Sequence, residues 1–261
     1  MSWELFIYFA AGALLFWIMG AIAALGNRHR ALSILCTTAG LLVFAFFIAA
    51  LWHSLERPPL RTMGETRLWY SFFLPIAGLL TYLRWNYKWI LSFTTLLSAV
   101  FIMVNIKNPD IHNKVLMPAL QSPWFAPHVI IYMFSYAILG AATLGALYYL
   151  VKEKKVSNPE RLMQMTDELV YAGTACITLG MLMGAIWAKE AWGHYWSWDP
   201  KETWAAATWL GYLLYIHYRL KKNASHKLSM ILLLVAFMLL QICWYGVNYL
   251  PSAQQSVHVY S

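Results

Sequence analysis

Tryptophan is concentrated between residues 187 and 209, which read WAKEAWGHYWSWDPKETWAAATW. Four indoles fall within thirteen residues of this segment: Trp192, Trp196, Trp198 and Trp204. Gly193 gives the backbone conformational freedom at this point, so neighbouring aromatic faces can together present a flat surface. Charged side chains, among them Lys189 and Asp199, lie between the indoles. A flat apolar surface beside charged groups suits a planar ligand that carries carboxylates.

A porphyrin fits this description better than a retinoid, a quinone or a sterol, because those lack paired propionates. The alternative is an aromatic belt at a membrane surface, followed by a well-capped helix. Asp199 is typical of a helix N-cap, Pro200 of the first helical position and Glu202 of a capping box, so a helix start is expected here. A belt needs only a few indoles at each interface. It does not explain four of them beside His194 and Tyr195 in one loop, which favours a ligand.

Histidine is a frequent axial ligand of porphyrin iron, and three of the eight histidines stand out. His128 follows Pro127 at the start of an apolar segment, and His258 lies in the C-terminal tail. They could be a ligand pair on one membrane face, or simply two interfacial histidines. His217 lies inside an apolar segment, where an ionisable group is a functional candidate. The alternative is a side chain that reaches the headgroups beside Arg219.

The elements that must position these residues are membrane helices. The 261 residues are 61% hydrophobic and 11% charged, whereas a soluble domain carries about 25% charged residues. A spanning helix needs roughly 20 mostly apolar residues. The sequence therefore predicts an all-α fold, a polytopic transmembrane helical bundle of about eight spans, the third of which is short and contains Pro75. These are expected near residues 4–25, 31–52, 68–83, 87–106, 128–151, 168–188, 203–220 and 226–249.

The basic residues predict how the chain crosses the membrane. With both termini on the outer side, 12 of the 19 Lys and Arg residues fall in inner loops and 7 in outer ones. The positive-inside rule favours this arrangement. It accounts for the net charge of +8 without a nucleic-acid partner. The segment 189–202, called the Trp loop below, and the tail 250–261 are then both outside.

The chain is expected to form a single transmembrane domain over residues 1–261, without a soluble domain. No internal repeat is strong enough in the sequence to predict a duplication. The three cysteines, Cys36, Cys176 and Cys243, lie in apolar runs without a CxxC spacing. Disulfide, zinc and thiol-redox sites are therefore not expected.

Several segments resemble one family. WGHYWSWDPKETWAAATW resembles the tryptophan-rich WWD signature of the heme-handling membrane proteins of cytochrome c biogenesis, and its WDPKETW form is similar to the CcsA (ResC) family of system II. LQSPWFAPHV at 120–129 resembles the segment with the first outer heme-ligand histidine, and SVHVY at 256–260 occupies the place of the second. RPPLRTMGETRLWYSF at 57–72 resembles the segment before an early core span. The tail departs from the common LHSYA pattern.

This resemblance implies roles for individual residues. His128 and His258 would be axial ligands of an outer heme b, and His217 would hold heme within the membrane. The platform for the heme ring would consist of Trp192, Gly193, Trp196, Trp198 and Asp199.

The resemblance also implies a setting and partners. The chain would be the heme-binding subunit of a cytochrome c synthetase, or heme lyase, that presents heme to the CxxCH motif of apocytochrome c. A CcsB (ResB)-type membrane subunit would supply the second ligand of the heme at His217, and a thiol-reducing protein would act on the outer side. The expected place is a bacterial inner (plasma) membrane or a thylakoid membrane, with the heme site on the periplasmic or lumenal face.

Three other functions stay open from the sequence. One is a CcmC-like heme chaperone that passes heme to a carrier, although the PKET continuation and the eight expected spans favour the synthetase. Another is a non-catalytic, regulatory CcsA-like membrane protein. A small-molecule transporter is the third, and the clustering of His and Trp on one face, with few charges inside the spans, argues against it.

Overall fold

The computed structural model describes residues 2–26, 29–108, 122–152 and 156–251. Within these ranges the chain forms eight α-helices and two short 3-10 helices, and no strand. It divides into two compact units, Met1–Leu116 and Met117–Ser261. The predicted all-α class is therefore confirmed.

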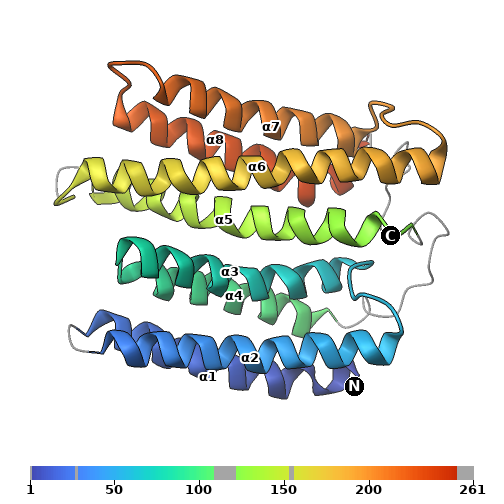
Figure 1. Ribbon diagram of the computed structural model, residues 1–261, viewed down its shortest axis with the longest axis horizontal. Helices are drawn as coiled ribbons and strands as arrows, with labels where there is room; N and C mark the ends of the chain where they lie inside the picture. Colours follow the sequence, from blue (N-terminus) through green and yellow to red (C-terminus); the bar gives the residue numbers. More distant parts are fainter. Residues whose placement is uncertain (1, 27–28, 109–121, 153–155, 252–261) are drawn as a thin grey trace. The chain divides into compact units, whose positions relative to one another are not determined.

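The first unit, unit 1, contains two helical hairpins (Figure 1). Helix α1 pairs along its length with α2, α3 pairs with α4, and α1 also packs against α4. The helices are α1 (Phe6–Leu25), α2 (Arg30–Leu55), α3 (Met63–Trp85) and α4 (Trp89–Lys107), and a 3-10 turn, η1 (Trp3–Leu5), precedes them.

The second unit, unit 2, has the same order of pairing. Helix α5 pairs with α6, α7 pairs with α8, and α5 packs against α8. The helices are α5 (Phe125–Lys152), α6 (Pro159–Trp192), α7 (Pro200–Arg219) and α8 (His226–Trp244), followed by a 3-10 turn, η5 (Gly246–Tyr249). The two units thus share an arrangement that the amino-acid pattern did not reveal.

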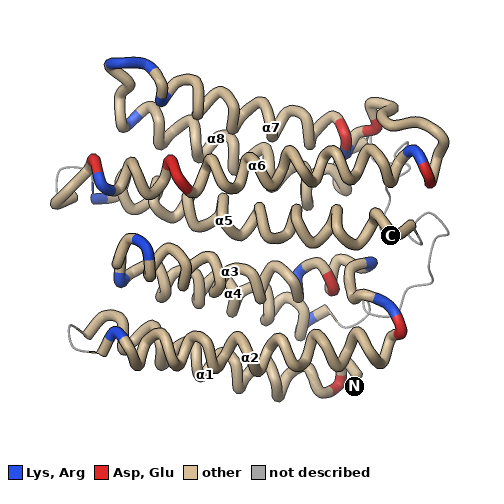
Figure 2. Tube along the Cα trace, in the orientation of Figure 1, with Lys and Arg blue, Asp and Glu red and all other residues tan. Residues whose placement is uncertain are grey.

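The helices are those of an integral membrane protein. Six of the eight are long and apolar enough to cross a bilayer: the segment Trp3–Leu25 and α2, α4, α5, α6 and α8. The third helix of each unit, α3 and α7, is more polar because it begins and ends with charged residues. Figure 2 shows basic residues gathered at the α3–α4 turn and at the α7–α8 turn. This clustering agrees with the predicted inner side, but the orientation in the membrane stays a prediction.

Helix α3 continues through Pro75, which the sequence marked as the weak point of the third span. A proline has no N–H, so the carbonyl four residues earlier loses its helical donor. That carbonyl belongs to Ser71, and it accepts a hydrogen bond of 2.6 Å from Ser98 Oγ of α4. The neighbouring helix thereby satisfies the backbone group that the proline leaves open, as spanning helices require.

Candidate functional site

His128 lies in the first turn of α5 and faces α6. Its Nδ1 is 2.8 Å from the carbonyl oxygen of Gly180. A carbonyl oxygen can only accept, so Nδ1 must carry the proton and donate it. In the neutral ring this leaves the ligand lone pair on Nε2. Metal-binding histidines commonly have this arrangement, in which the second ring nitrogen donates to a backbone carbonyl that fixes the tautomer.

Two glycines of α6 make room for the first turns of α5. A Cβ on Gly184 would lie 2.6 Å from Cε1 of the His128 ring, and a Cβ on Gly180 would lie 2.8 Å from the ring of Tyr132. Real Cβ atoms do not approach other atoms so closely. The absence of these two side chains therefore allows the close approach that brings Nδ1 of His128 to the α6 backbone.

Trp187 of α6 connects His128 to the Trp loop. The centroid of its ring lies 5.6 Å from the centroid of the imidazole and 4.9 Å from that of Trp192. Trp187 is only 2% exposed, so it forms part of the packed interior of unit 2. The structure thus brings together two of the predicted site residues, His128 and Trp192. Trp187 itself was not singled out from the sequence, because no sequence pattern indicates which tryptophan meets a residue some 60 positions away.

The Trp loop is shorter than expected, because α6 extends to Trp192. Gly193 ends that helix in the left-handed conformation, with φ of 86°, and its N–H donates to the carbonyl of Lys189 at 3.1 Å. The side-chain Nζ of Lys189 donates to the carbonyl of Gly193 at 2.8 Å. Glycine is the residue that adopts this conformation without steric cost. The predicted backbone role of Gly193 is therefore to turn the chain out of α6.

The predicted start of α7 is confirmed. Asp199 is the N-cap, Pro200 is the first helical residue, and Asp199 and Glu202 form a capping box. The backbone N–H of Lys201 donates to Asp199 Oδ1 at 2.9 Å, and the N–H of Asp199 donates to Glu202 Oε2 at 3.2 Å. Both carboxyl groups are buried, Asp199 at 7% exposure and Glu202 at 9%. Asp199 therefore orders the end of the Trp loop.

Trp196 and Trp198 lie in the segment that connects α6 to α7. Their rings meet edge to face, with centroids 5.7 Å apart and planes at 84°. Trp198 is 69% exposed. The Nε1–H of Trp196 is buried and has no hydrogen-bond acceptor among the described residues. A bound carboxylate would supply such an acceptor, although other indoles in the described helices, such as Trp17, share this property.

His217 lies near the opposite end of α7. At about 1.5 Å per residue it is roughly 26 Å along the helix from Pro200. Its Nδ1 is 2.8 Å from the carbonyl oxygen of Leu213, so Nδ1 is again the donor and Nε2 carries the lone pair of the neutral ring. The side chain is exposed on unit 2. The structure therefore does not bring His217 together with His128 and the Trp loop.

An ion pair fixes this end of α7 to α6, and the sequence did not indicate it. Asp167 accepts two hydrogen bonds from Arg219 Nε, at 2.9 and 3.2 Å, and one from Arg219 Nη2 at 2.8 Å. It also accepts the hydroxyl of Tyr215 at 2.8 Å. Residues two positions apart on a helix differ by about 200° in direction. Since Tyr215 and Arg219 both face α6, His217 is turned away from it.

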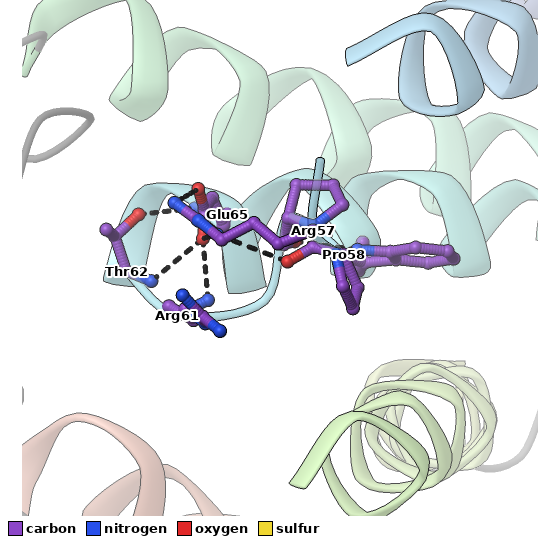
Figure 3. Close-up of polar contacts among 7 residues, drawn as sticks. Arg57, Pro58, Arg61, Thr62 and Glu65 are labelled. Carbon is purple, nitrogen blue, oxygen red and sulfur yellow. Dashed lines mark hydrogen bonds and ion pairs between the residues drawn. The ribbon is translucent and has the colours of Figure 1, made fainter. Parts of the chain in front are cut away.

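A second buried carboxylate lies in unit 1, at the start of α3 (Figure 3). Glu65 is completely buried and forms a bidentate pair with Arg57, whose Nη2 lies 2.8 Å from Oε1 and whose Nη1 lies 3.1 Å from Oε2. The same Oε2 accepts the backbone N–H groups of Arg61 at 2.6 Å and Thr62 at 3.1 Å. Burial, and then repulsion by Arg57, lower the pKa of the Arg61 guanidinium.

The remaining predicted ligand, His258, lies outside the described residues. Among the residues that the structure does describe, no group of three or more His, Cys, Asp or Glu side chains could hold a bare metal ion. The described part of the candidate site consists of one oriented imidazole and an aromatic loop. Such a donor set fits an iron porphyrin, since the macrocycle itself supplies four ligands.

Comparison with known proteins shows the family to which this chain is similar. The family of cytochrome c assembly proteins matches residues 3–253. The cytochrome c biogenesis protein CcsA of Pelargonium hortorum is 34% identical over 239 residues, which cover 74% of this chain and 75% of that protein. CcsA of Pyropia yezoensis is 30% identical, with 96% of this chain and 95% of that protein covered.

A solved structure has the same fold. The cytochrome c heme lyase CcmF superposes with a TM-score of 0.72 over 97% of this chain, at 16% sequence identity. The match covers 48% of the CcmF chain, so the present chain spans about half the length of that protein. The chain belongs to the cytochrome c assembly protein family, and the similarity to CcsA that the tryptophan motif predicted is confirmed.

Proposed function

We propose that this chain binds heme at the outer membrane face and presents it to the CxxCH motif of apocytochrome c, as the heme-binding subunit of a CcsA/CcsB-type synthetase. The chain acts in cytochrome c maturation, as its family does. The observation that carries it is the His128 imidazole, whose Nδ1–H donates to Gly180 O at 2.8 Å and whose Nε2 can therefore ligate iron.

The residues around His128 would bind and orient the ligand. Trp187 packs between the imidazole and Trp192, so a ring ligated by His128 would lie close to the aromatic loop. His258 is proposed as the second axial ligand on the basis of the family resemblance. Holding the ring in one orientation converts an encounter with the apocytochrome into a positioned reaction.

Heme b is the proposed cofactor, and when bound it would supply the vinyl groups to which the two CxxCH thiols add. The protein groups contribute binding and orientation, and the ring of Trp187 packs beside the imidazole. A thiol-reducing protein on the outer side is a proposed partner, because the thiols must be reduced to react. The proposed location is a bacterial inner membrane or a thylakoid membrane.

His217 is proposed to hold heme inside the membrane together with a CcsB (ResB)-type subunit. Its exposed position on α7 and its Nδ1–H bond to the Leu213 carbonyl support this, because they leave Nε2 on a surface that another subunit can reach. The second ligand would then come from that subunit.

The absorption spectrum of the purified protein tests the outer ligands. We expect His128→Ala combined with His258→Ala, with His217 intact, to abolish the bis-histidine spectrum of the outer heme. His53→Ala, an exposed position in the last turn of α2, is the control and should leave the spectrum unchanged. An unchanged spectrum in the double variant would refute the ligand assignment.

Covalent attachment tests the synthetase role. The chain is co-expressed with a CxxCH reporter, with and without a CcsB-type subunit, and covalent heme on the reporter is measured. Attachment that depends on both subunits supports the synthetase. If the chain contains heme but none becomes attached to the reporter, a heme chaperone is favoured. If the purified chain never contains heme, a regulatory role is favoured.

A further inference from the structure

Trp198 has an unusual backbone conformation. Its φ is 59°, in the left-handed region that bulky residues rarely adopt. Among the described residues, two other non-glycine residues have a positive φ, Glu56 and Asn86, and each ends a helix as its C-cap, where this conformation is common. Trp198 does not end a helix, since it lies one residue before the N-cap of α7.

The side chain of Trp198 does not compensate for this strain by packing. It is 69% exposed, and its ring meets Trp196 only edge to face. A strained residue persists only where its surroundings force the conformation, and such residues cluster at functional sites.

The first turn of α7 holds the backbone on both sides of Trp198. Oε2 of Glu202 accepts the N–H of Ser197 at 2.8 Å and the N–H of Asp199 at 3.2 Å, the residues immediately before and after the tryptophan. The hydroxyl of Thr203 donates to the carbonyl of Trp198 itself at 3.1 Å. One buried carboxylate oxygen thus bridges the two peptide groups that flank the strained residue.

We propose that Glu202 is a positioning residue that holds Trp198 in the left-handed conformation, so that its indole stands out of the Trp loop as part of the face on which heme packs. This inference rests on the proposed heme-binding function. It assigns to Glu202 a role beyond capping α7: the carboxylate acts on the ligand through Trp198 and does not touch it.

Unit 1 offers a matched control. Glu65 occupies the equivalent position in the capping box of α3 and likewise accepts two backbone N–H groups from the preceding turn, those of Arg61 and Thr62. Neither of these residues has a positive φ, so here the carboxylate caps a helix without holding a strained residue. Glu65→Ala therefore reports what the loss of a buried capping carboxylate, here together with its ion pair to Arg57, does to the fold without touching the Trp loop.

Hydrogen exchange tests the positioning without any heme. In the ligand-free protein, Glu202→Ala should speed exchange of the Ser197 and Asp199 amides about tenfold, because both lose their acceptor. Glu202→Gln keeps a carbonyl oxygen at the same place and should stay near the wild-type rates. Glu65→Ala should leave these two amides unchanged. Exchange that is not accelerated in Glu202→Ala would overturn the positioning role, whatever happens to heme.

A double-mutant cycle tests whether Glu202 acts through Trp198. We expect Trp198→Ala and Glu202→Ala each to lower the heme bound per protein several-fold, and the double variant to lose no more than Trp198→Ala alone, because the two residues act as one unit. Glu202→Gln should restore most of the loss. Additive losses, or full heme content in Trp198→Ala, would each overturn the proposal.

The two experiments separate this inference from the proposed function. If the wild-type protein binds no heme in the double-mutant cycle, the proposed function fails, and the exchange rates still decide whether Glu202 orders the loop. If Glu202→Ala does not fold, Glu202→Asp takes its place. The carboxylate is then one methylene too short, and intermediate acceleration of the Ser197 and Asp199 amides is expected. Wild-type rates in that variant would count against the inference.

Discussion

Two glycines of α6 fix the position of the His128 imidazole. Gly184 leaves space for the ring, and the carbonyl of Gly180 accepts its Nδ1–H at 2.8 Å. The orientation of the ligand nitrogen is therefore set on α6, the helix opposite to the one that carries the histidine.

Gly184→Ala should displace the imidazole. The new Cβ would lie 2.6 Å from the ring, and overpacking of this kind costs about 1–3 kcal/mol. The ring cannot stay both clear of the methyl group and bonded to the Gly180 carbonyl. We expect heme bound per protein, measured by the visible absorption spectrum, to fall about tenfold.

Gly173→Ala is the control for this substitution. Gly173 lies on the same helix, and a Cβ there would meet Leu139 of α5 at 2.5 Å, without involving a histidine. It should lower the thermal stability in detergent to a similar degree while leaving the heme spectrum intact. Equal loss of heme in the two variants would show that the effect is general overpacking between α5 and α6.

At this scale the sequence predicted residue types better than contacts. The aromatic loop, His128 and the Asp199 capping residue could all be recognised from local patterns. The partners of His128 could not, because Gly180 is 52 positions away and meets it only through the register of two packed helices. The strain at Trp198 also has no local signature, since left-handed residues are expected at glycine or asparagine.

Among the elements, α3 depends on a buried ion pair at its start. Glu65 has no exposed side-chain surface, and its partner Arg57 is 16% exposed. A carboxylate in such a place is stabilised by its cation and by the N–H groups that it accepts. Removal of the cation leaves a buried charge without its counterion.

Arg57→Met should therefore destabilise unit 1 by about 3–5 kcal/mol. Adding Glu65→Gln should recover part of the loss, because the uncompensated charge is removed as well. Thermal unfolding in detergent measures both variants. A double variant less stable than Arg57→Met would contradict this explanation.

Hydropathy alone does not predict the residue at which a helix begins. Helix α6 begins at Pro159, nine residues before the predicted span at 168, because its first turns carry Glu160 and Arg161 and extend beyond the apolar segment. The start of α7 was predicted correctly because capping chemistry, unlike hydropathy, marks one residue.

Within the whole molecule, each unit pairs its helices in the same order, yet only unit 2 carries the proposed outer ligand among the described residues. In the first turns of α1, Phe9 packs on Phe46 and Phe47 of α2, whereas in the first turn of α5 His128 packs on α6. The similarity lies in the order of helix pairing and the difference in the side chains. That is why no repeat was visible in the sequence.

The orientation of the molecule in the membrane can be tested by labelling. In a protein whose three cysteines, all free, are replaced, His194→Cys should react with an impermeant maleimide added from outside, and Lys222→Cys should not until the membrane is opened. Both positions are exposed, so accessibility depends on the side of the membrane alone. The reason is the excess of basic residues expected on the inner side. The reverse labelling pattern would place the Trp loop on the wrong side for the proposed function.

The hydrogen bond from Ser98 to the Ser71 carbonyl bears on how the chain is made. Helix α3 is more polar than α4 and contains Pro75, so alone it would expose an open carbonyl to lipid. We therefore expect α3 to leave the translocon only together with α4, as one hairpin. In a glycosylation-reporter assay α3 should insert poorly by itself and efficiently when α4 follows. Ser98→Ala should lower the insertion efficiency of α3 in the presence of α4. The start of α3, with its Arg57–Glu65 pair, would then be in its final place only after the ribosome has finished α4.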